Sequence, residues 1–373
     1  MHSYWEYQEW FKDVDHVIIG SGIVGLQCAI SLRQKYPTDK IIVLERGYLP
    51  SGASSKNAGF ACFGSPSEIL DDLRTNSPEE VADLVELRAR GLEILKNTCG
   101  ANEIEFEQFG SHEVFTKEER ALYENCASRL EELNKLLAPI FKTDIFEIAD
   151  QNISHFGFND VDHLIKNKLE GQINTGKMIQ RFIQLARDSK IEIINGAEAT
   201  TLENNGEHVM IELNQQFAFR SSKVYIANNG FAAKLLPELD VKPARAQVLV
   251  TSPINDLKLK GTFHMFEGYF YFRNIGNRIL FGGGRNLDLE GETTTELNIS
   301  ELIQNDLEHK LKNVVIPGKE FTIDHRWAGI MGVGETKKPI VQHISPNVIC
   351  GVRMGGMGVA IGSIIGDQMA NLT

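Results

Sequence analysis

The chain has 373 residues, a length that favours two closely joined domains over one. Its hydrophobic content of 42% is enough for sizeable cores. Its formal net charge is -12 and it has no tract rich in lysine or arginine, so we expect it to bind no nucleic-acid backbone, which basic residues must neutralise. No run of about 18 apolar residues predicts a membrane span. Residues 1–11 lack a cationic start and an apolar core, so we expect no signal peptide and a cytoplasmic protein.

The cysteines and the aromatic N-terminus predict little chemistry. The five cysteines are scattered, and none forms a pair spaced like metal ligands or a redox dithiol, so we expect buried thiols in a reducing compartment and no metal site. Trp5, Trp10 and Phe11 precede the first predicted strand. We expect these rings to pack back onto the domain, with contact to a partner as the alternative.

Residues 15–45 contain the motif from which most of the other predictions follow. The apolar run 16–19 predicts a strand buried on both faces, and Gly20-Ser-Gly22-Ile-Val-Gly25 follows it directly. Gly20 allows a tight turn, Gly22 lets the backbone approach a pyrophosphate, and Gly25 lets the next helix pack close to the strand. The pattern therefore predicts a dinucleotide-binding turn.

The residues after this turn support the prediction. A helix is expected over about 22–36, followed by a buried strand over 41–44 that ends at Glu45. Glu45 has about the spacing at which an acid accepts hydrogen bonds from an adenosine ribose, and it would repel the 2′-phosphate of NADP. The alternative is a glycine-rich turn that binds nothing.

A loop of small residues over 47–64 follows, with no helical or strand period. A loop of this length is uncommon on a plain surface, and beside a pyrophosphate it favours a cofactor contact. Ser54 and Ser55 offer hydroxyl groups, Asn57 an amide, and Ala58-Gly59 a backbone that can approach a flat ring.

The glycine turn, Leu44-Glu45-Arg46 and Ser51-Gly-Ala-Ser-Ser-Lys-Asn-Ala-Gly-Phe60 together resemble FAD-dependent oxidoreductases of the D-amino-acid oxidase superfamily, with the glycine oxidase and sarcosine oxidase branch most similar. The resemblance implies an α/β fold, in which a Rossmann-like FAD-binding domain is interleaved with an α+β substrate domain built on an antiparallel sheet. It implies FAD contacts from Gly20, Gly22, Ile23, Val24, Gly25, Glu45, Arg46, Ala53, Ser54, Ser55, Asn57, Ala58, Gly59, Phe60, Ala199, Asn228, Asn229, Gly230, Gly355, Gly356, Met357, Gly358 and Val359.

The two domains are expected to be discontinuous. We assign residues 1–75, 170–238 and 320–373 to the FAD-binding domain, and residues 76–169 and 239–319 to the substrate domain.

Several helices and one irregular stretch are expected between the motifs. Ser77-Pro-Glu-Glu80 predicts a capped helix start. Residues 117–141 predict one long amphipathic helix, and 300–314 a shorter one. Residues 146–164 are expected to be irregular.

The chain ends in a second strand, glycine turn and helix, over residues 348–362. Gly355, Gly356 and Gly358 would bring a helix N-terminus against an electronegative atom. In the family this end lies by the N1–C2=O edge of the flavin, where negative charge develops on reduction.

The substrate cavity is expected over a β-rich block from residue 243 to 285, in which Tyr269, Tyr271, Arg273 and Arg285 are candidates to reach the substrate. Each alone is more often a packing or surface residue. In the glycine oxidase branch an arginine after Trp-Ala-Gly-Leu pairs with the substrate carboxylate, and a second arginine lies in the last glycine loop.

Here the first of these positions is Met331, which cannot form a bidentate ion pair, and the second is a glycine. Arg353, Arg326 or Arg285 could replace the missing cations, and our hypothesis is that Arg353 or Arg285 binds an anionic substrate group.

By resemblance, the protein oxidises a small amine or amino acid to an imine by hydride transfer to flavin N5, and oxygen or another acceptor reoxidises the flavin. In the covalent-flavin branch of the family a cysteine near the last segment is used. Cys350 lies close to that place but on the strand before the glycine loop, so non-covalent FAD is expected. The alternatives are a 2-hydroxy acid dehydrogenase of the same fold, a NAD-dependent dehydrogenase and a non-catalytic flavin-binding subunit. A tRNA-modifying role is disfavoured by the acidic charge. The sequence leaves the oligomeric state open.

Overall fold

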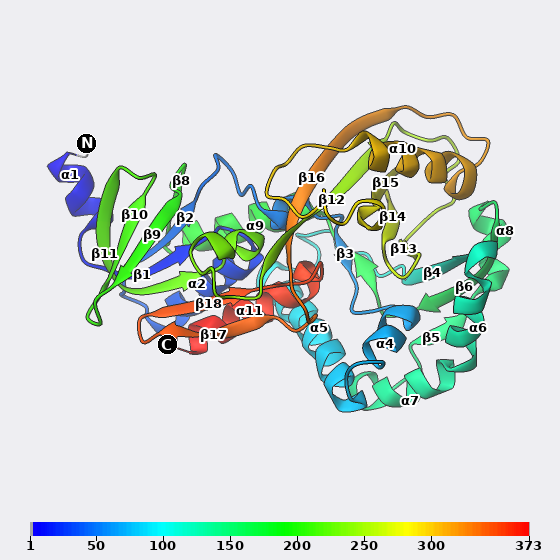
Figure 1. The fold of residues 1–373 in the computed structure, drawn as a ribbon, viewed down its shortest axis with the longest axis horizontal. Coiled ribbons are helices and arrows are strands. Elements are labelled where there is room, and N and C mark those ends of the chain that lie inside the picture. The colour runs from blue at the N-terminus through cyan, green and yellow to red at the C-terminus, as the bar shows by residue number, and fades with distance from the viewer. Residues whose placement is uncertain (1–2, 373) are drawn as a thin grey trace.

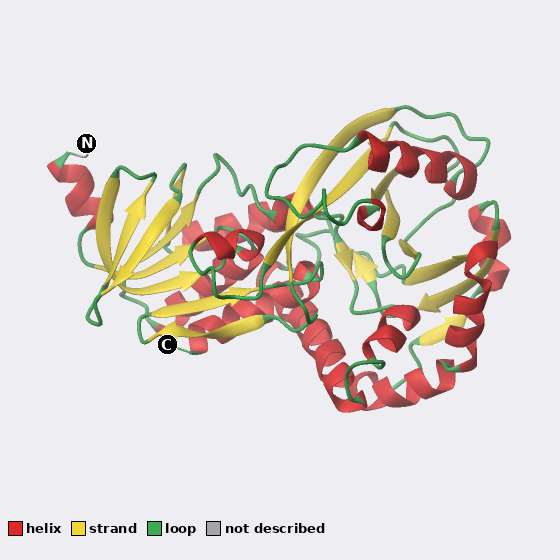
Figure 2. Cartoon of the chain, viewed as in Figure 1, coloured by secondary structure: helices red, strands yellow, loops and turns green. Residues whose placement is uncertain are grey.

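A computed structural model describes residues 3–372, and it is built on two eight-stranded sheets (Figures 1 and 2). The first sheet has the order β17-β18-β11-β1-β2-β8. In addition, β10 pairs with β11, and β9 pairs with β10. Its strands are β1 (Val14–Ile19), β2 (Ile41–Glu45), β8 (Glu192–Asn195), β9 (Ala199–Asn204), β10 (Val209–Leu213), β11 (Phe217–Ile226), β17 (Ile340–Ser345) and β18 (Val348–Val352). Strands β18, β11, β1, β2 and β8 are parallel neighbours, as expected for a dinucleotide-binding sheet with both faces covered.

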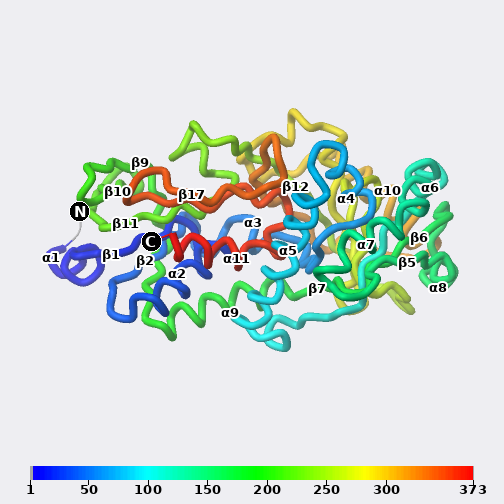
Figure 3. Tube along the Cα trace, turned by 90° about the horizontal axis from the view of Figure 1, so that it is seen from below, coloured from blue at the N-terminus to red at the C-terminus, as the bar shows by residue number. Residues whose placement is uncertain are grey.

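Side chains of β1 and β2 alternate between two cores. Ile18 and Val43 face the core that α2 (Ile23–Lys35), α9 (Thr175–Asp188) and α11 (Gly358–Asn371) cover. Val17 and Leu44 face the opposite core. Segments from the first and last parts of the sequence meet here, because α11 packs directly on α2, as Figure 3 shows.

The second sheet has the order β16-β12-β15-β14-β13-β4-β6-β5, and only the β13–β4 pair in it is parallel. Its strands are β4 (Ser111–Thr116), β5 (Phe146–Ile148), β6 (Val161–Asn167), β12 (Lys242–Thr251), β13 (Thr262–Met265), β14 (Phe270–Ile275), β15 (Arg278–Gly283) and β16 (Ile323–Val333). Phe263, Phe272 and Phe281 form the core between this sheet and α10 (Glu301–Lys310). The predicted fold class is confirmed by this arrangement, whereas the exact domain limits stay a prediction.

Short elements lie between the two sheets. The strands β3 (Phe60–Ala61) and β7 (Gly171–Gln172) form a small antiparallel ladder. The helices in the first half of the chain after α2 are α3 (Ala53–Lys56), α4 (Pro66–Asp72), α5 (Pro78–Cys99), α6 (Arg120–Ser128), α7 (Leu130–Phe141) and α8 (Ile153–Phe156), of which α6, α7 and α8 lie at the outer end of the second sheet (Figure 1). The predicted capping box of α5 is present, with Ser77 and Glu80 bonded to each other's backbone N–H.

Three local predictions are wrong. The helix expected over 117–141 is broken at Arg129, whose φ of -110° and ψ of 7° are not helical; the break lets α6 and α7 bury their apolar faces separately. The stretch 146–164 contains β5, α8 and β6, because their backbone groups pair with the second sheet or within the helix. Trp5 and Trp10 are 71% and 40% exposed, and only Phe11 packs back onto the sheet.

Among residues 3–372, no helix is both long enough and apolar enough to cross a bilayer.

Candidate functional site

A cavity of about 820 Å³ is lined by residues from both large sheets. Its wall comes from the β1–α2 turn, the loop after β2, the start of β9, the turn after β11, the strands β12 to β16 and the turn between β18 and α11. Segments from both ends of the chain and from its middle therefore form one continuous site.

The three glycines of the first turn have different surroundings. Gly20 has a φ of +111°, which favours glycine, and a Cβ there would lie 2.9 Å from the carbonyl oxygen of Ala227. Gly22 lines the cavity, and its missing Cβ leaves room beside Ser54 Oγ. Gly25 lies behind the wall, where a Cβ would be 1.9 Å from the Gly20 carbonyl oxygen. These placements match the tight turn, the close approach and the helix packing inferred from the sequence.

The carboxylate of Glu45 is fixed beside this turn. Its Oε2 accepts a hydrogen bond from Ser21 Oγ at 2.6 Å, and its Oε1 accepts from Gly47 N and Ser51 Oγ, both at 2.8 Å. Glu45 is 5% exposed and lines the cavity. Oε2 accepts a second, longer hydrogen bond from Ser21 N at 3.4 Å, and a ribose hydroxyl can take the place of this weaker donor.

The wall next to Glu45 is formed by Arg46, whose guanidinium carbon lies 3.6 Å above the ring of Phe231. Both residues line the cavity together with Ala199. This stack closes the cavity beside the end of β2 with a flat surface.

The small-residue loop is held by its own side chains. Asn57 Oδ1 accepts from Gly59 N at 2.8 Å and from Thr175 Oγ1 at 2.9 Å, so the amide shapes the turn as well as lining the cavity. Arg273 lies behind this loop and donates to the carbonyl oxygens of Ala58 and Ile173. Burial lowers the pKa of Arg273 to about 10. Arg273, a sequence candidate for the substrate, is therefore outside the cavity wall and clamps the loop.

The C-terminal turn joins the same cavity. Gly355 and Gly356 have φ values of +56° and +83°, and both line the wall with the first residues of α11. Asn229 Oδ1 accepts from Arg353 N at 3.0 Å and from Met354 N at 3.2 Å. This amide ties the turn after β11 to the turn before α11.

The structure brings most of the expected FAD contacts into the wall. Gly25, Ser55, Gly59 and Gly230 are the expected contacts outside it. Ser55 Oγ donates to the Pro50 carbonyl oxygen at 2.5 Å, and a Cβ at Gly230 would lie 2.3 Å from the Met331 carbonyl oxygen. These four residues shape the wall from behind.

The three arginines proposed for the substrate are separated. Arg353 bonds to Asp240 Oδ2 at 2.6 Å and to the Lys338 carbonyl oxygen at 2.9 Å, and Arg326 bonds to Gln304 and Glu308. Neither arginine lines the cavity, whereas Arg285 does. Arg285 Nε is buried and has no hydrogen-bond partner among residues 3–372. Of the three candidates, Arg285 is therefore the one that lines the cavity, and its Nε is an unpaired buried donor.

One part of the cavity wall is aromatic. The ring of Phe60 meets the ring of Tyr271 at 5.5 Å and that of His264 at 5.2 Å, both edge-to-face. Burial raises the pKa of Tyr271 to about 12 and lowers that of His264 to about 4, so the phenol keeps its proton and the imidazole is neutral at physiological pH. Met331 lines the same space.

Sequence reasoning missed His264, Glu68 and Lys337, which all line the cavity. Glu68 forms an ion pair with Arg88 at 3.2 Å, and Lys337 forms one with Asp72 at 2.6 Å. The strand alternation in Thr262-Phe-His-Met265 could have placed His264 opposite the buried Phe263, although it could not show what the other face meets.

Two helix N-termini and one free amide suit this cavity to a dinucleotide. The first residues of α2 and of α11 line the wall, and helix N-termini favour negative charge. Asn228 Oδ1 is buried in the wall without a hydrogen-bond partner among residues 3–372, so it can accept one from a ligand hydroxyl. The fold and this site define a dinucleotide-binding protein whose cavity also has an aromatic wall.

Comparison with known families agrees with this class. The sequence profile described as "DAO: FAD dependent oxidoreductase" matches residues 15–372. The chain therefore belongs to the DAO family, whose members are FAD-dependent oxidoreductases. The glycine turn, Glu45 and the two helix N-termini fit FAD by their donors and by their close backbone approach.

Individual relatives are distant in sequence but similar in fold. The chain is 19% identical to "Probable oxidoreductase OrdL" of Haemophilus influenzae, over 96% of this chain and 82% of the relative. The crystal structure of glycine oxidase from Geobacillus kaustophilus has a TM-score of 0.76 at 19% identity and covers 96% of this chain and 94% of its own. L-Proline dehydrogenase from P. horikoshii has a TM-score of 0.76 at 16% identity, covering 96% and 93%.

Proposed function

We propose that the protein oxidises a small amine or amino acid to an imine, with FAD, bound non-covalently, accepting a hydride from the carbon beside the nitrogen. The observation that carries the proposal is the single cavity in which the FAD-type glycine turns meet an aromatic chamber holding the free arginine Arg285. The names of two similar structures, a glycine oxidase and an L-proline dehydrogenase, support an amine substrate.

The chain's own residues supply orientation and a dry chamber. Phe60 and Tyr271 give the apolar wall that favours the neutral, reactive form of an amine, since a low dielectric disfavours the charged form. Tyr271 keeps its proton and can donate one hydrogen bond to the substrate. Holding the substrate in line with the hydride acceptor is worth more to such a reaction than a strong base.

Arg285 is proposed to bind an anionic group of the substrate. The resemblance expects the carboxylate-binding arginine at the position of Met331, which lies on β16. Arg285 follows β15, and β12 lies between these two strands. Two strand spacings amount to about 10 Å across the sheet. We therefore propose a substrate that is longer than glycine, with its anionic group farther from the reacting carbon.

Cys350, the cysteine near the position used by covalent-flavin relatives, is fully buried in the core of the first sheet and is not in the cavity wall. Its placement supports non-covalent FAD. Acid precipitation of the purified protein should release all flavin into the supernatant, and flavin remaining with the pellet would contradict this part of the proposal.

The test is anaerobic reduction of the FAD-loaded protein by two matched panels, amines and amino acids in one and the corresponding 2-hydroxy acids in the other. Bleaching of the flavin absorbance by members of the amine panel alone is expected. Bleaching by the hydroxy acids alone would replace the proposal with hydroxy-acid oxidation. If neither panel reduces a flavin that dithionite does reduce, a non-catalytic role is favoured. Reoxidation by oxygen or by an artificial acceptor then identifies the electron acceptor class.

A further inference from the structure

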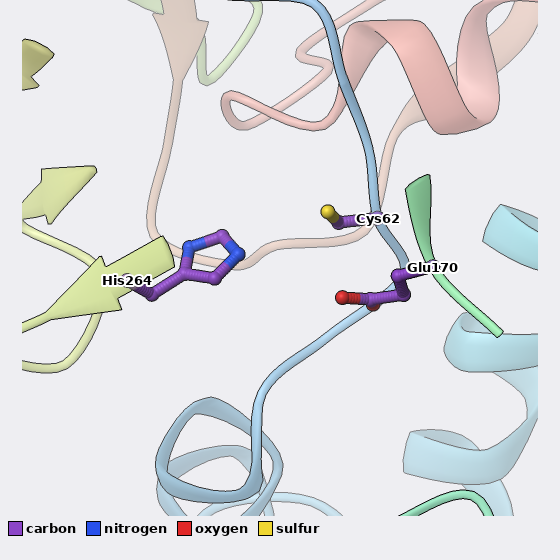
Figure 4. A group of neighbouring side chains, drawn as sticks. All are labelled: Cys62, Glu170 and His264. Atoms are coloured by element: carbon purple, nitrogen blue, oxygen red, sulfur yellow. The ribbon is translucent and has the colours of Figure 1, made fainter. Parts of the chain in front are cut away.

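We propose that Cys62, Glu170 and His264 bind a divalent metal ion, with Zn²⁺ the best match, in the wall of the substrate chamber. Their ligand atoms all lie within 4.8 Å of one another, and Figure 4 shows the three side chains converging. Cys62 and His264 also line the cavity. The inference rests on these groups alone and does not require the proposed amine oxidation.

Strand pairing places the three groups together. The β3–β7 ladder pairs Ala61 with Gly171, so the next position on each side brings Cys62 opposite Glu170. His264 comes from β13, on the neighbouring large sheet. Cys62 follows β3 directly and Glu170 directly precedes β7, so the ladder fixes the backbone next to both groups, and His264 lies within β13, which favours a defined coordination site.

The carboxylate is oriented in advance. Glu170 Oε1 accepts hydrogen bonds from Phe63 N at 2.6 Å and Gly64 N at 2.9 Å, and Oε2 accepts one from the hydroxyl of Ser111. Since Oε2 has a second lone pair, it remains able to bind a metal ion. Hydrogen bonds of this kind orient the ligands of metal sites in general.

The histidine has the clearest unused capacity. His264 Nε2 is buried and has no hydrogen-bond partner among residues 3–372, which is costly for an imidazole nitrogen unless something binds it. Cys62 Sγ lies 3.4 Å from Thr262 Oγ1 and 3.9 Å from the Gly171 carbonyl oxygen, and it also hydrogen-bonds the Glu170 carboxylate. A metal ion would satisfy the imidazole and would replace the contact between Cys62 and Glu170 with two ligand bonds.

The donor set selects the metal. A thiolate, an imidazole and a carboxylate are the ligands of Zn²⁺, at about 2.3 Å from sulfur and about 2.0–2.2 Å from nitrogen and oxygen. Binding replaces the thiol proton of Cys62, which leaves to solvent, and the two negative ligands then balance the ion's charge. The three ligand atoms lie within 4.8 Å of one another, so they would have to move closer together on binding. Because Cys62 and His264 line the cavity, water or a small molecule could reach the ion from there as a fourth ligand.

The sequence could not predict this site, because the site takes one cysteine, one glutamate and one histidine that are far apart in the chain. Only the pairing of β3 with β7, and the approach of β13, brings them together.

The test uses FAD-loaded protein with any affinity tag removed, stripped with a chelator and then titrated with Zn²⁺. Elemental analysis after desalting should give one Zn²⁺ per chain. Cys62→Ser and His264→Gln should each weaken binding more than Ser111→Ala, for which a loss of about 10-fold is expected. Cys28→Ser is the matched control, because Cys28 is equally buried but lies in α2, away from the cavity; it should bind Zn²⁺ like the parent.

Co²⁺ provides a readout that needs no variant. In the parent protein it should give intense d–d absorption at wavelengths beyond the flavin bands, together with a thiolate charge-transfer band, as tetrahedral sulfur-containing sites do. Flavin content and thermal melting establish that each variant is folded. Equal Zn²⁺ binding by folded Cys62→Ser, His264→Gln and parent protein would overturn the proposal. So would the absence of stoichiometric Zn²⁺ and of the Co²⁺ bands in the parent.

Discussion

Replacing Arg285 is the sharpest test of how the substrate is held. Arg285 lines the cavity, and its Nε is buried without a partner among residues 3–372. Arg285→Ala should therefore remove the cation that pairs with the substrate's anionic group, while the FAD contacts in the glycine turns stay in place.

The size of the effect follows from the hydrogen bonds lost. A guanidinium can donate two parallel hydrogen bonds to a carboxylate, each worth about 1.5–3 kcal/mol when charged. Allowing for the partial exposure of Arg285, we take about 3 kcal/mol for the pair, which corresponds to a rise on the order of 100-fold in the substrate dissociation constant. Arg285→Lys keeps the charge but loses the two-pronged geometry, so a rise of about 10-fold is expected.

The assay is anaerobic stopped-flow reduction of the flavin across a range of substrate concentrations. The dissociation constant should rise, with a smaller change in the limiting rate and unchanged flavin content. Arg278→Gln is the control, because Arg278 lies on β15, the strand that leads to Arg285, but pairs with Asp324 and is outside the cavity wall.

An uncharged analogue of the substrate, lacking its anionic group, separates binding from general damage. Arg285→Ala should leave binding of this analogue close to that of the parent. An equal loss with both compounds, or no change with either, would refute the role assigned to Arg285.

Three further predictions concern FAD binding and stability. Gly22→Ala should weaken FAD binding with a modest loss of stability, because the new Cβ lies in the cavity wall 2.7 Å from Ser54 Oγ; fluorescence titration of the stripped protein measures it. Arg353→Gln should lower the free energy of unfolding by about 2 kcal/mol, because it breaks the partly buried pair with Asp240; denaturant titration checks this, and the reduction rate at saturating substrate should not change. Burial raises the pKa of the Glu113 carboxyl from 4.5 to about 7. Between these two pH values the carboxyl is protonated in the folded protein and ionised in the unfolded chain. The free energy of unfolding should therefore fall by about 3 kcal/mol as the pH rises from 4.5 to 7. Glu113→Gln should flatten the fall, and an unchanged slope would show that another group causes it.

The sequence could predict which residues of the first glycine turn and of the strand end after it share one wall, because they are close together in the chain. Gly22 and Glu45 belong to one strand–turn–helix–strand unit, and the physical needs of a pyrophosphate and a ribose restrict both positions. The C-terminal turn was predictable for the same reason, since a strand, two glycines and a helix follow one another there.

The substrate half could not be predicted in this way. His264 reaches the chamber from β13, and Arg285 follows β15, so their meeting depends on strand order and register rather than on spacing in the chain. Arg353 is near the glycine turn in sequence, but its side chain points to Asp240 instead. Likewise, the break at Arg129 leaves no glycine or proline as a sign in the sequence.

This difference explains how the fold persists while the chemistry of the chamber can change. The FAD half is built largely from backbone groups and glycines, which many sequences can supply once the turns are kept. The proposed substrate region is built from side chains on separate segments, among them Met331 and Arg285, which both line the cavity. The fold matches that of a glycine oxidase with a TM-score of 0.76 at only 19% identity, so the substrate has to be inferred from the charges in the cavity rather than from the fold.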